Sequence, residues 1–171
     1  MEAMKGKAFI LAVLAALTLS VGCGAARQTS EEKNAEQKRT EEAVNRCLDE
    51  RNYQIDIDYM MPQRGPGKSL TDSDGIKVEG SVLSSYLPYF GVAHSVPYGG
   101  GKGLHFKETI AKYEDEGWKK DGRDISISVS NDEDSYVYQL TVYKNGNVSL
   151  TVSCQNKDSI SYRGELRLGG E

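Results

Sequence analysis

Apolar and polar residues alternate with a period of two along most of the chain. The alternation is clearest over residues 53–59, 76–79, 125–130, 136–142, 148–153 and 160–168. In the stretch 125–130, for example, Ile125, Ile127 and Val129 alternate with serines. This pattern is typical of β-strands that bury one face and expose the other to water. The sequence therefore predicts a mainly β domain over residues 51–169.

Short polar connections separate the predicted strands. Asn145 and Gly146 stand between two alternating stretches and predict a hairpin with a type I′ turn, and residues 131–134 form another tight connection. No helix-length segment is present to carry parallel crossovers, so consecutive hairpins predict an antiparallel meander of about eight strands. Such a sheet buries its apolar face by closing into a lipocalin-like barrel, and the alternative is a β-sandwich.

The region before the first strand has a helical pattern. Residues 24–28 are a short spacer, and Thr29 with Glu32 fits a helix-capping box. Residues 31–42 are charged on all sides, which is typical of a solvated stalk. An apolar strip at helical spacing follows, and it consists of Ala43, Val44, Cys47 and Leu48. We therefore expect residues 23–50 to form a spacer and a helix that docks on the β domain.

The first residues have the layout of a lipoprotein export signal. Lys5 and Lys7 precede an apolar run over residues 8–17, which is too short to span a bilayer, and Gly22 precedes Cys23. We expect residues 1–22 to be cleaved and Cys23 to carry fatty acyl chains, which anchor the mature protein in the membrane. The expected location is the outer membrane of a Gram-negative bacterium, facing the periplasm. The alternative is an ordinary cleaved signal.

Charge and composition exclude several functions. The net charge of −4 argues against binding to nucleic acid. Only His94 and His105 are available as histidines, and no Gly-x-Ser-x-Gly motif occurs. Residues 65–69 imitate part of a phosphate-binding loop, but the first glycine of that motif is missing. We expect no catalytic residues, metal or cofactor, and a hydrolase is a remote alternative.

Two further cysteines bear on the fold. Cys47 and Cys154 are a candidate disulfide pair, because the predicted export leads to an oxidising compartment. The alternative is two separate thiols that pack as small apolar side chains.

The most distinctive local chemistry lies within residues 80–106, where the alternation stops. Prolines stiffen this segment and glycines permit turns, and aromatic rings stand between them. The candidate binding loop consists of Tyr86, Leu87, Pro88, Tyr89, Phe90, Gly91, Pro97 and Tyr98.

The same segment carries a family resemblance. Residues 85–91, 97–100 and 104–106, with Asn145-Gly146 and residues 160–164 downstream, closely resemble the DUF4251 family, whose function is not established. The resemblance implies an exported envelope protein with a β-rich, lipocalin-like fold and leaves its activity open. Val92 stands where the family pattern leads us to expect a basic residue, which weakens any charge-based role of the loop.

These observations lead to one main functional hypothesis, a lipid-anchored, non-catalytic module that binds or scaffolds an envelope protein. In an alternative, the barrel carries a small apolar ligand and Tyr86, Tyr89, Phe90 and Tyr98 surround its mouth. In a third interpretation, the same rings close the core beneath a long loop. The inward series is mostly Ile, Val, Leu and Tyr, with Gly164 as the small exception, which favours a filled interior.

Overall fold

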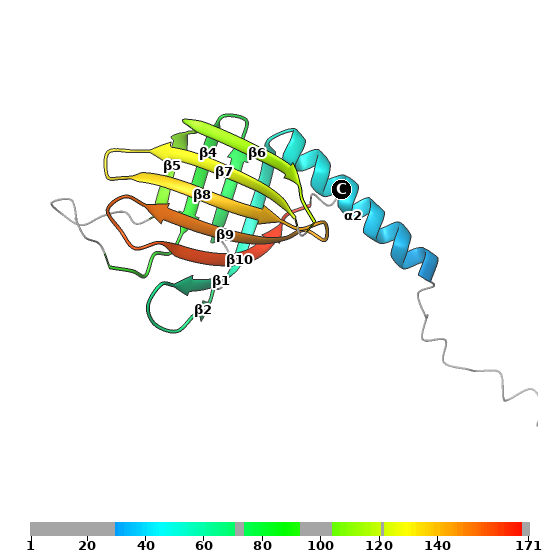
Figure 1. The fold of residues 1–171 in the computed structure, drawn as a ribbon, viewed down its shortest axis with the longest axis horizontal. Helices are drawn as coiled ribbons and strands as arrows, with labels where there is room; N and C mark the ends of the chain where they lie inside the picture. Colours follow the sequence, from blue (N-terminus) through cyan, green and yellow to red (C-terminus); the bar gives the residue numbers. More distant parts are fainter. Residues whose placement is uncertain (1–29, 71–73, 93–103, 121, 169–171) are drawn as a thin grey trace, which may run out of the picture. The chain divides into compact units, whose positions relative to one another are not determined.

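The computed structural model describes residues 30–70, 74–92, 104–120 and 122–168 (Figure 1). The chain divides into two compact units, residues 1–34 and residues 35–171. Only residues 30–34 of the first unit are described, and they form the first turn of a helix. Within the described ranges, no helix is both long and apolar enough to cross a membrane.

The described residues form one helix and ten strands. They are α2 Ser30–Asp49, β1 Asn52–Pro62, β2 Lys68–Ser69, β3 Gly75–Glu79, β4 Val82–Leu87, β5 Leu104–Thr109, β6 Lys112–Trp118, β7 Arg123–Ser130, β8 Ser135–Val142, β9 Asn147–Cys154 and β10 Ile160–Leu166.

All of the strands belong to one antiparallel sheet, in the order β5-β4-β3-β1-β10-β9-β8-β7-β6, with β2 paired to β1. The first long strand therefore pairs with the last, from Ile55 opposite Leu166 to Pro62 opposite Ile160. Figure 1 shows that the sheet curls, so that β7 to β10 cross in front of β1, β4 and β5. The predicted antiparallel, barrel-like β fold with an N-terminal helix is confirmed.

The two edge strands of this order, β5 and β6, are consecutive in the chain. Only Ile110 and Ala111 separate them. The Ile110 N–H donates to the Ser81 carbonyl at 2.8 Å, and the Ala111 N–H donates to the Ser128 carbonyl at 2.9 Å. One bent segment therefore pairs with β4 through its first half and with β7 through its second half. This arrangement brings the two edges of the curled sheet together and satisfies the backbone groups at the bend.

The core lies inside the curled sheet, where the alternating apolar residues point. Its fully buried members include Ile55, Val78, Leu83, Ile127, Tyr138, Leu150 and Tyr162. Helix α2 adds Val44 and Leu48, which belong to the predicted apolar strip and are almost completely buried. Burying such side chains stabilises the fold by about 1.5–3 kcal/mol each.

The hairpin between β8 and β9 forms where it is predicted, but its turn differs. The Gly146 N–H donates to the Tyr143 carbonyl and the Tyr143 N–H donates to the Asn147 carbonyl, both at 2.9 Å. Gly146 has a φ of 90°, whereas Asn145 does not have a positive φ. A type I′ turn needs positive φ at both central residues, so that prediction is wrong. A single left-handed glycine closes a longer turn instead.

Candidate functional site

The candidate binding loop begins within β4 and continues past its end. Leu87 points into the core and is fully buried, whereas Tyr86 is 55% exposed, Phe90 51% and Val92 50%. Pro88 and Tyr89 are half-buried. The loop therefore separates into residues that close the core and residues that face water. The sequence leaves open whether the rings of this loop lie in the core or at the surface. The structure shows both situations in different parts of the loop.

Hydrogen bonds fix the backbone of residues 88–92 against the region around β10. The Tyr162 hydroxyl donates to the Pro88 carbonyl at 2.8 Å, and the Tyr89 hydroxyl donates to the Asp158 carbonyl at 3.0 Å. The Asp158 N–H donates to the Val92 carbonyl at 3.1 Å. Burial raises the pKa of Tyr89 to about 12, so its hydroxyl stays protonated and able to donate. The exposed rings thus stand on a firmly held segment.

Each exposed ring has a partner that orients it. Tyr86 stacks on His105, the residue opposite it on β5, with ring centroids 4.2 Å apart. The Lys68 ammonium nitrogen lies 4.0 Å from the centroid of the Phe90 ring, within the range of a cation–π interaction. We call the group Lys68, Tyr86, Phe90, Val92 and His105 the aromatic surface. It combines exposed apolar rings with two groups that can donate hydrogen bonds.

Tyrosine side chains fill the interior beside this loop. Tyr136, Tyr138 and Tyr162 are among the largest fully buried side chains, and the Tyr138 hydroxyl donates to Ser85 Oγ at 2.9 Å. Phe106 stacks on Tyr136 with centroids 4.9 Å apart. This packing favours a filled interior at this end over a space for an apolar ligand.

A buried lysine lies next to these rings. Lys157 is 8% exposed, and its ammonium nitrogen lies 5.7 Å from the Tyr136 ring centroid and 6.0 Å from that of Tyr89. The nearest carboxylate oxygen among the described residues, from Glu133, is 3.9 Å away. Within the described chain the ammonium has no hydrogen-bond partner. The neighbouring tyrosine rings and the carboxylate of Glu133 compensate the ammonium for only part of the hydration that it loses on burial.

The candidate disulfide is not formed, because Cys47 and Cys154 are both free thiols. Cys154 pairs with Tyr136 at the start of β8, whereas Arg123, which contacts α2 close to Cys47, pairs with Val142 at the end of β8. The two thiols therefore lie at opposite ends of the barrel, too far apart for a bond. Burial, with Asp134 nearby, raises the pKa of Cys154 to about 11, which keeps the thiol protonated and unreactive at neutral pH.

Several predicted residues lie outside the described part of the chain. They are Cys23 and the whole of residues 1–22, together with Pro97 and Tyr98. Among the residues that are described, no group of three or more His, Cys, Asp or Glu side chains could hold a metal ion.

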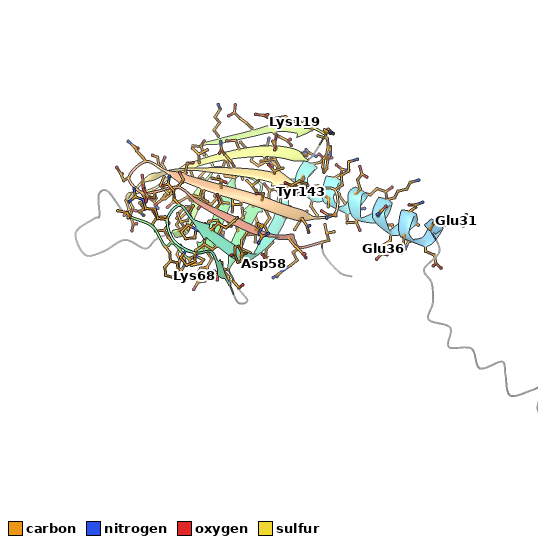
Figure 2. The ribbon with its side chains drawn as sticks, turned by 60° about the horizontal axis from the view of Figure 1, so that its bottom comes forward. Glu31, Glu36, Asp58, Lys68, Lys119 and Tyr143 are labelled. Atoms are coloured by element: carbon orange, nitrogen blue, oxygen red, sulfur yellow. The ribbon has the colours of Figure 1, made fainter. Side chains whose placement is uncertain are left out.

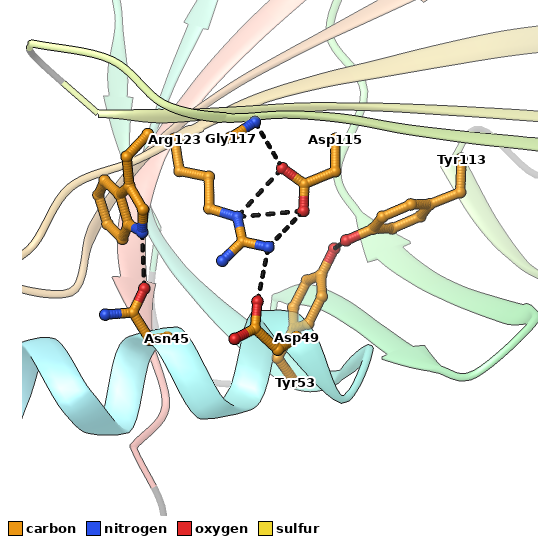
Figure 3. A network of polar contacts seen from close by, with 8 residues as sticks. Asn45, Asp49, Tyr53, Tyr113, Asp115, Gly117 and Arg123 are labelled. Carbon is orange, nitrogen blue, oxygen red and sulfur yellow. Dashed lines mark hydrogen bonds and ion pairs between the residues drawn. The ribbon is translucent and has the colours of Figure 1, made fainter.

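A polar network that the sequence analysis does not anticipate joins α2 to the sheet (Figure 3). The Arg123 guanidinium, 11% exposed, pairs with Asp115 on β6 and with Asp49 on α2, the latter at 2.8 Å. Burial alone would raise the pKa of Asp115, but hydrogen bonds from Arg123 and the Gly117 N–H outweigh it and hold this pKa below its usual value. The alternation of apolar and polar residues does not predict this network, because the network joins residues that are far apart in the sequence.

Two aromatic contacts extend the same network. The Trp118 indole N–H donates to Asn45 Oδ1 at 2.6 Å, and the Tyr53 and Tyr113 hydroxyls lie 3.3 Å apart. Figure 3 shows that the helix contributes Asn45 and Asp49 from one side. We interpret this network as the attachment of α2 to the barrel, and not as a site of chemistry.

The geometry defines a class of protein: a small barrel-like β domain with a docked N-terminal helix and an exposed aromatic loop. A family model described as a domain of unknown function, DUF4251, matches residues 35–166, and the chain belongs to this family. The resemblance seen in the sequence is thus confirmed. A search of curated proteins found no match.

The fold also matches a solved structure, the crystal structure of a DUF4251 family protein from Bacteroides eggerthii DSM 20697. The TM-score is 0.55 and the sequence identity 16%, and the match covers 77% of this chain and 89% of the other. At this level of identity the similarity supports the fold alone.

Proposed function

We propose that the protein is a lipid-anchored, non-catalytic module of the bacterial cell envelope that binds a protein partner. The export signal ending at Cys23 supports the anchor, which we place in the outer membrane on its periplasmic side. Residues 35–39 of α2 are exposed, as expected of a stalk between the anchor and the β domain.

One observation carries the partner hypothesis: the aromatic surface exposes two rings on a segment that hydrogen bonds hold in place. Aromatic side chains anchor many protein interfaces, and rings that are already ordered lose little entropy on binding. Lys68 and His105 stand beside the rings as donors. We therefore expect the partner to present apolar side chains next to a carboxylate or a carbonyl group.

The carrier of a small apolar ligand is the weaker alternative. Such a carrier needs an apolar space inside the barrel, whereas Tyr136, Tyr138 and Tyr162 occupy the interior near the loop. The exposed rings also point away from the core, which suits a surface contact better than the lining of a ligand cavity.

Site-specific photocrosslinking in living cells tests the partner hypothesis. A photoreactive phenylalanine analogue in place of Phe90 should give a discrete adduct with one envelope protein. Tyr86→Ala in the same chain should reduce that adduct several-fold. The matched control carries the analogue at Gln139, which is also exposed but lies on β8. An equal adduct from both positions, or none from Phe90, would contradict the hypothesis.

Palmitate labelling tests the anchor. Cells fed labelled palmitate should incorporate it into the wild-type chain and not into Cys23→Ser. Wild-type protein without label would refute the lipid anchor and leave the partner hypothesis standing, since the aromatic surface does not depend on it.

A further inference from the structure

The outer face of the sheet has a hollow that the functions discussed above do not use. It has a volume of about 660 Å³, and its lining includes Asp58, Tyr59, Tyr143, Asn147, Arg163 and Glu165. A second hollow of about 490 Å³ shares Asp58 and Glu165 with the first. The two form one extended depression over β1, β10 and β9 (Asp58 and Tyr143 are labelled in Figure 2).

Strand pairing explains why these side chains gather there. Tyr59 lies opposite Arg163, and Arg163 opposite Ser149, which forms one row across the sheet. Glu165 lies opposite Asn147, and Asn147 is bonded to Tyr143, which forms the next row. Residues two apart on a strand share a face, so both rows point outward. From β1 to the end of β8 the rows span three strand spacings, roughly 14 Å.

The depression contains three charged groups that are not neutralised by an ion pair within the described chain. The Arg163 guanidinium lies over the Tyr59 ring, 4.8 Å from its centroid, which orients its donors. Among the described residues, Arg163, Asp58 and Glu165 form no ion pair, whereas the neighbouring Asp56 is bound by Arg167 at 2.8 Å. Oriented donors from Arg163 and free carboxylate acceptors are thus available side by side.

The chemistry of the lining selects the class of ligand. Two free carboxylates disfavour phosphate groups, and so many polar side chains disfavour an apolar ligand. A chain of hydroxyl groups both donates and accepts hydrogen bonds, as Arg163, Asn147 and the carboxylates require. Tyr143, 39% exposed at one edge, offers a ring against which the apolar C–H face of a sugar can pack. We propose that this depression binds a carbohydrate chain of a few units.

A glycan array probed with the full-length protein in detergent tests this site. We expect at least one bacterial oligosaccharide to be retained, and calorimetry with that oligosaccharide should show about a tenfold loss of affinity in Tyr143→Ala. Arg163→Lys should weaken binding similarly, because lysine keeps the charge but loses the planar set of donors. Both positions are exposed, so thermal unfolding of these variants should stay close to wild type.

Tyr86→Ala is the control, because it removes an exposed ring of the aromatic surface and should leave glycan affinity unchanged. An array without any bound glycan would overturn the proposal. Equal affinity in wild type, Tyr143→Ala and Arg163→Lys would overturn it too. The site does not rest on the partner hypothesis, because the two surfaces use different residues.

Discussion

Single residues of the segment 86–91 divide between core and surface. Leu87 is fully buried, whereas Tyr86 before it and Phe90 after it are about half exposed. Residue type alone does not separate them, since Leu, Tyr and Phe are all apolar enough for a core. Their positions relative to the end of β4 determine whether they are buried. The inward and outward alternation continues through Leu87, and hydrogen bonds determine the course of the backbone beyond it.

This division gives a prediction about stability. Replacing both Tyr86 and Phe90 by Ala should change the free energy of unfolding by less than about 1 kcal/mol, because exposed side chains contribute little. Leu87→Ala should cost about 2–5 kcal/mol, since it leaves a cavity in the core. Urea denaturation measures both. A large loss in the double variant would mean that the rings belong to the core.

At position 164 the backbone of the neighbouring strand β1 leaves no room for a side chain. A β-bulge between Ile57 and Tyr59 brings β1 close to β10, and a Cβ on Gly164 would lie 2.0 Å from the Asp56 carbonyl oxygen. Gly164→Ala should therefore force the two strands apart and destabilise the protein by about 1–3 kcal/mol. Ser149→Ala on the next strand is the control and should be nearly neutral. Equal urea midpoints for the two variants would contradict this account.

At the scale of elements, the sequence predicts the helix and most strands because each has its own periodicity. The sequence predicts the hairpin at Gly146 but not its turn type, because only Gly146 adopts a positive φ there. The bend at Ile110 and Ala111 is not predicted, because it depends on hydrogen bonds to Ser81 and Ser128. The sequence predicts only part of the attachment of α2 to the barrel. Val44 and Leu48 follow the helical period, but Asp49, Asp115 and Arg123 show no common pattern.

The attachment should make stability depend on pH. The native pKa of Asp115 lies below that of the unfolded chain, so the native carboxyl binds fewer protons. Its contribution is complete above the unfolded value of about 4 and is lost as the pH falls through the native pKa. Asp115→Asn should thus cost about 1–3 kcal/mol at pH 7 and much less near pH 2.

Chemical denaturation of wild type and Asp115→Asn between pH 7 and pH 2 measures this difference. Asp132→Asn, which removes an exposed carboxyl in the β7–β8 turn, is the matched control and should show little effect at any pH. A cost for Asp115→Asn that stays constant over this range would mean that the carboxylate charge is not what holds the helix.

For the whole molecule, the sequence predicts the barrel-like closure because a sheet with one apolar face must cover it. It does not predict which residues meet across the barrel, and this limits the prediction of sites. The cysteines show the difficulty: the predicted export makes a disulfide chemically reasonable, but the strand registers and the contact of Arg123 with α2 place Cys47 and Cys154 at opposite ends of the barrel. The depression on the outer face is equally hidden, since it combines three strands and a turn.

Thiol titration checks this arrangement. In unreduced Cys23→Ser protein unfolded in urea, both Cys47 and Cys154 should react with a thiol reagent. In the native protein Cys154 should react much more slowly than a free cysteine, because its pKa of about 11 leaves little thiolate. A peptide that joins Cys47 to Cys154 in an unreduced digest would refute the assignment as free thiols.

The pairing of β1 with β10 constrains how the protein can fold. Strand β1 begins at Asn52, but its partner ends only at Leu166, so this contact closes almost the whole β domain. When the N-terminal part of the chain is made first, one edge of β1 stays unpaired until β10 is available. We therefore expect slow, late acquisition of structure, and we expect a newly made chain to depend on a chaperone that shields that edge.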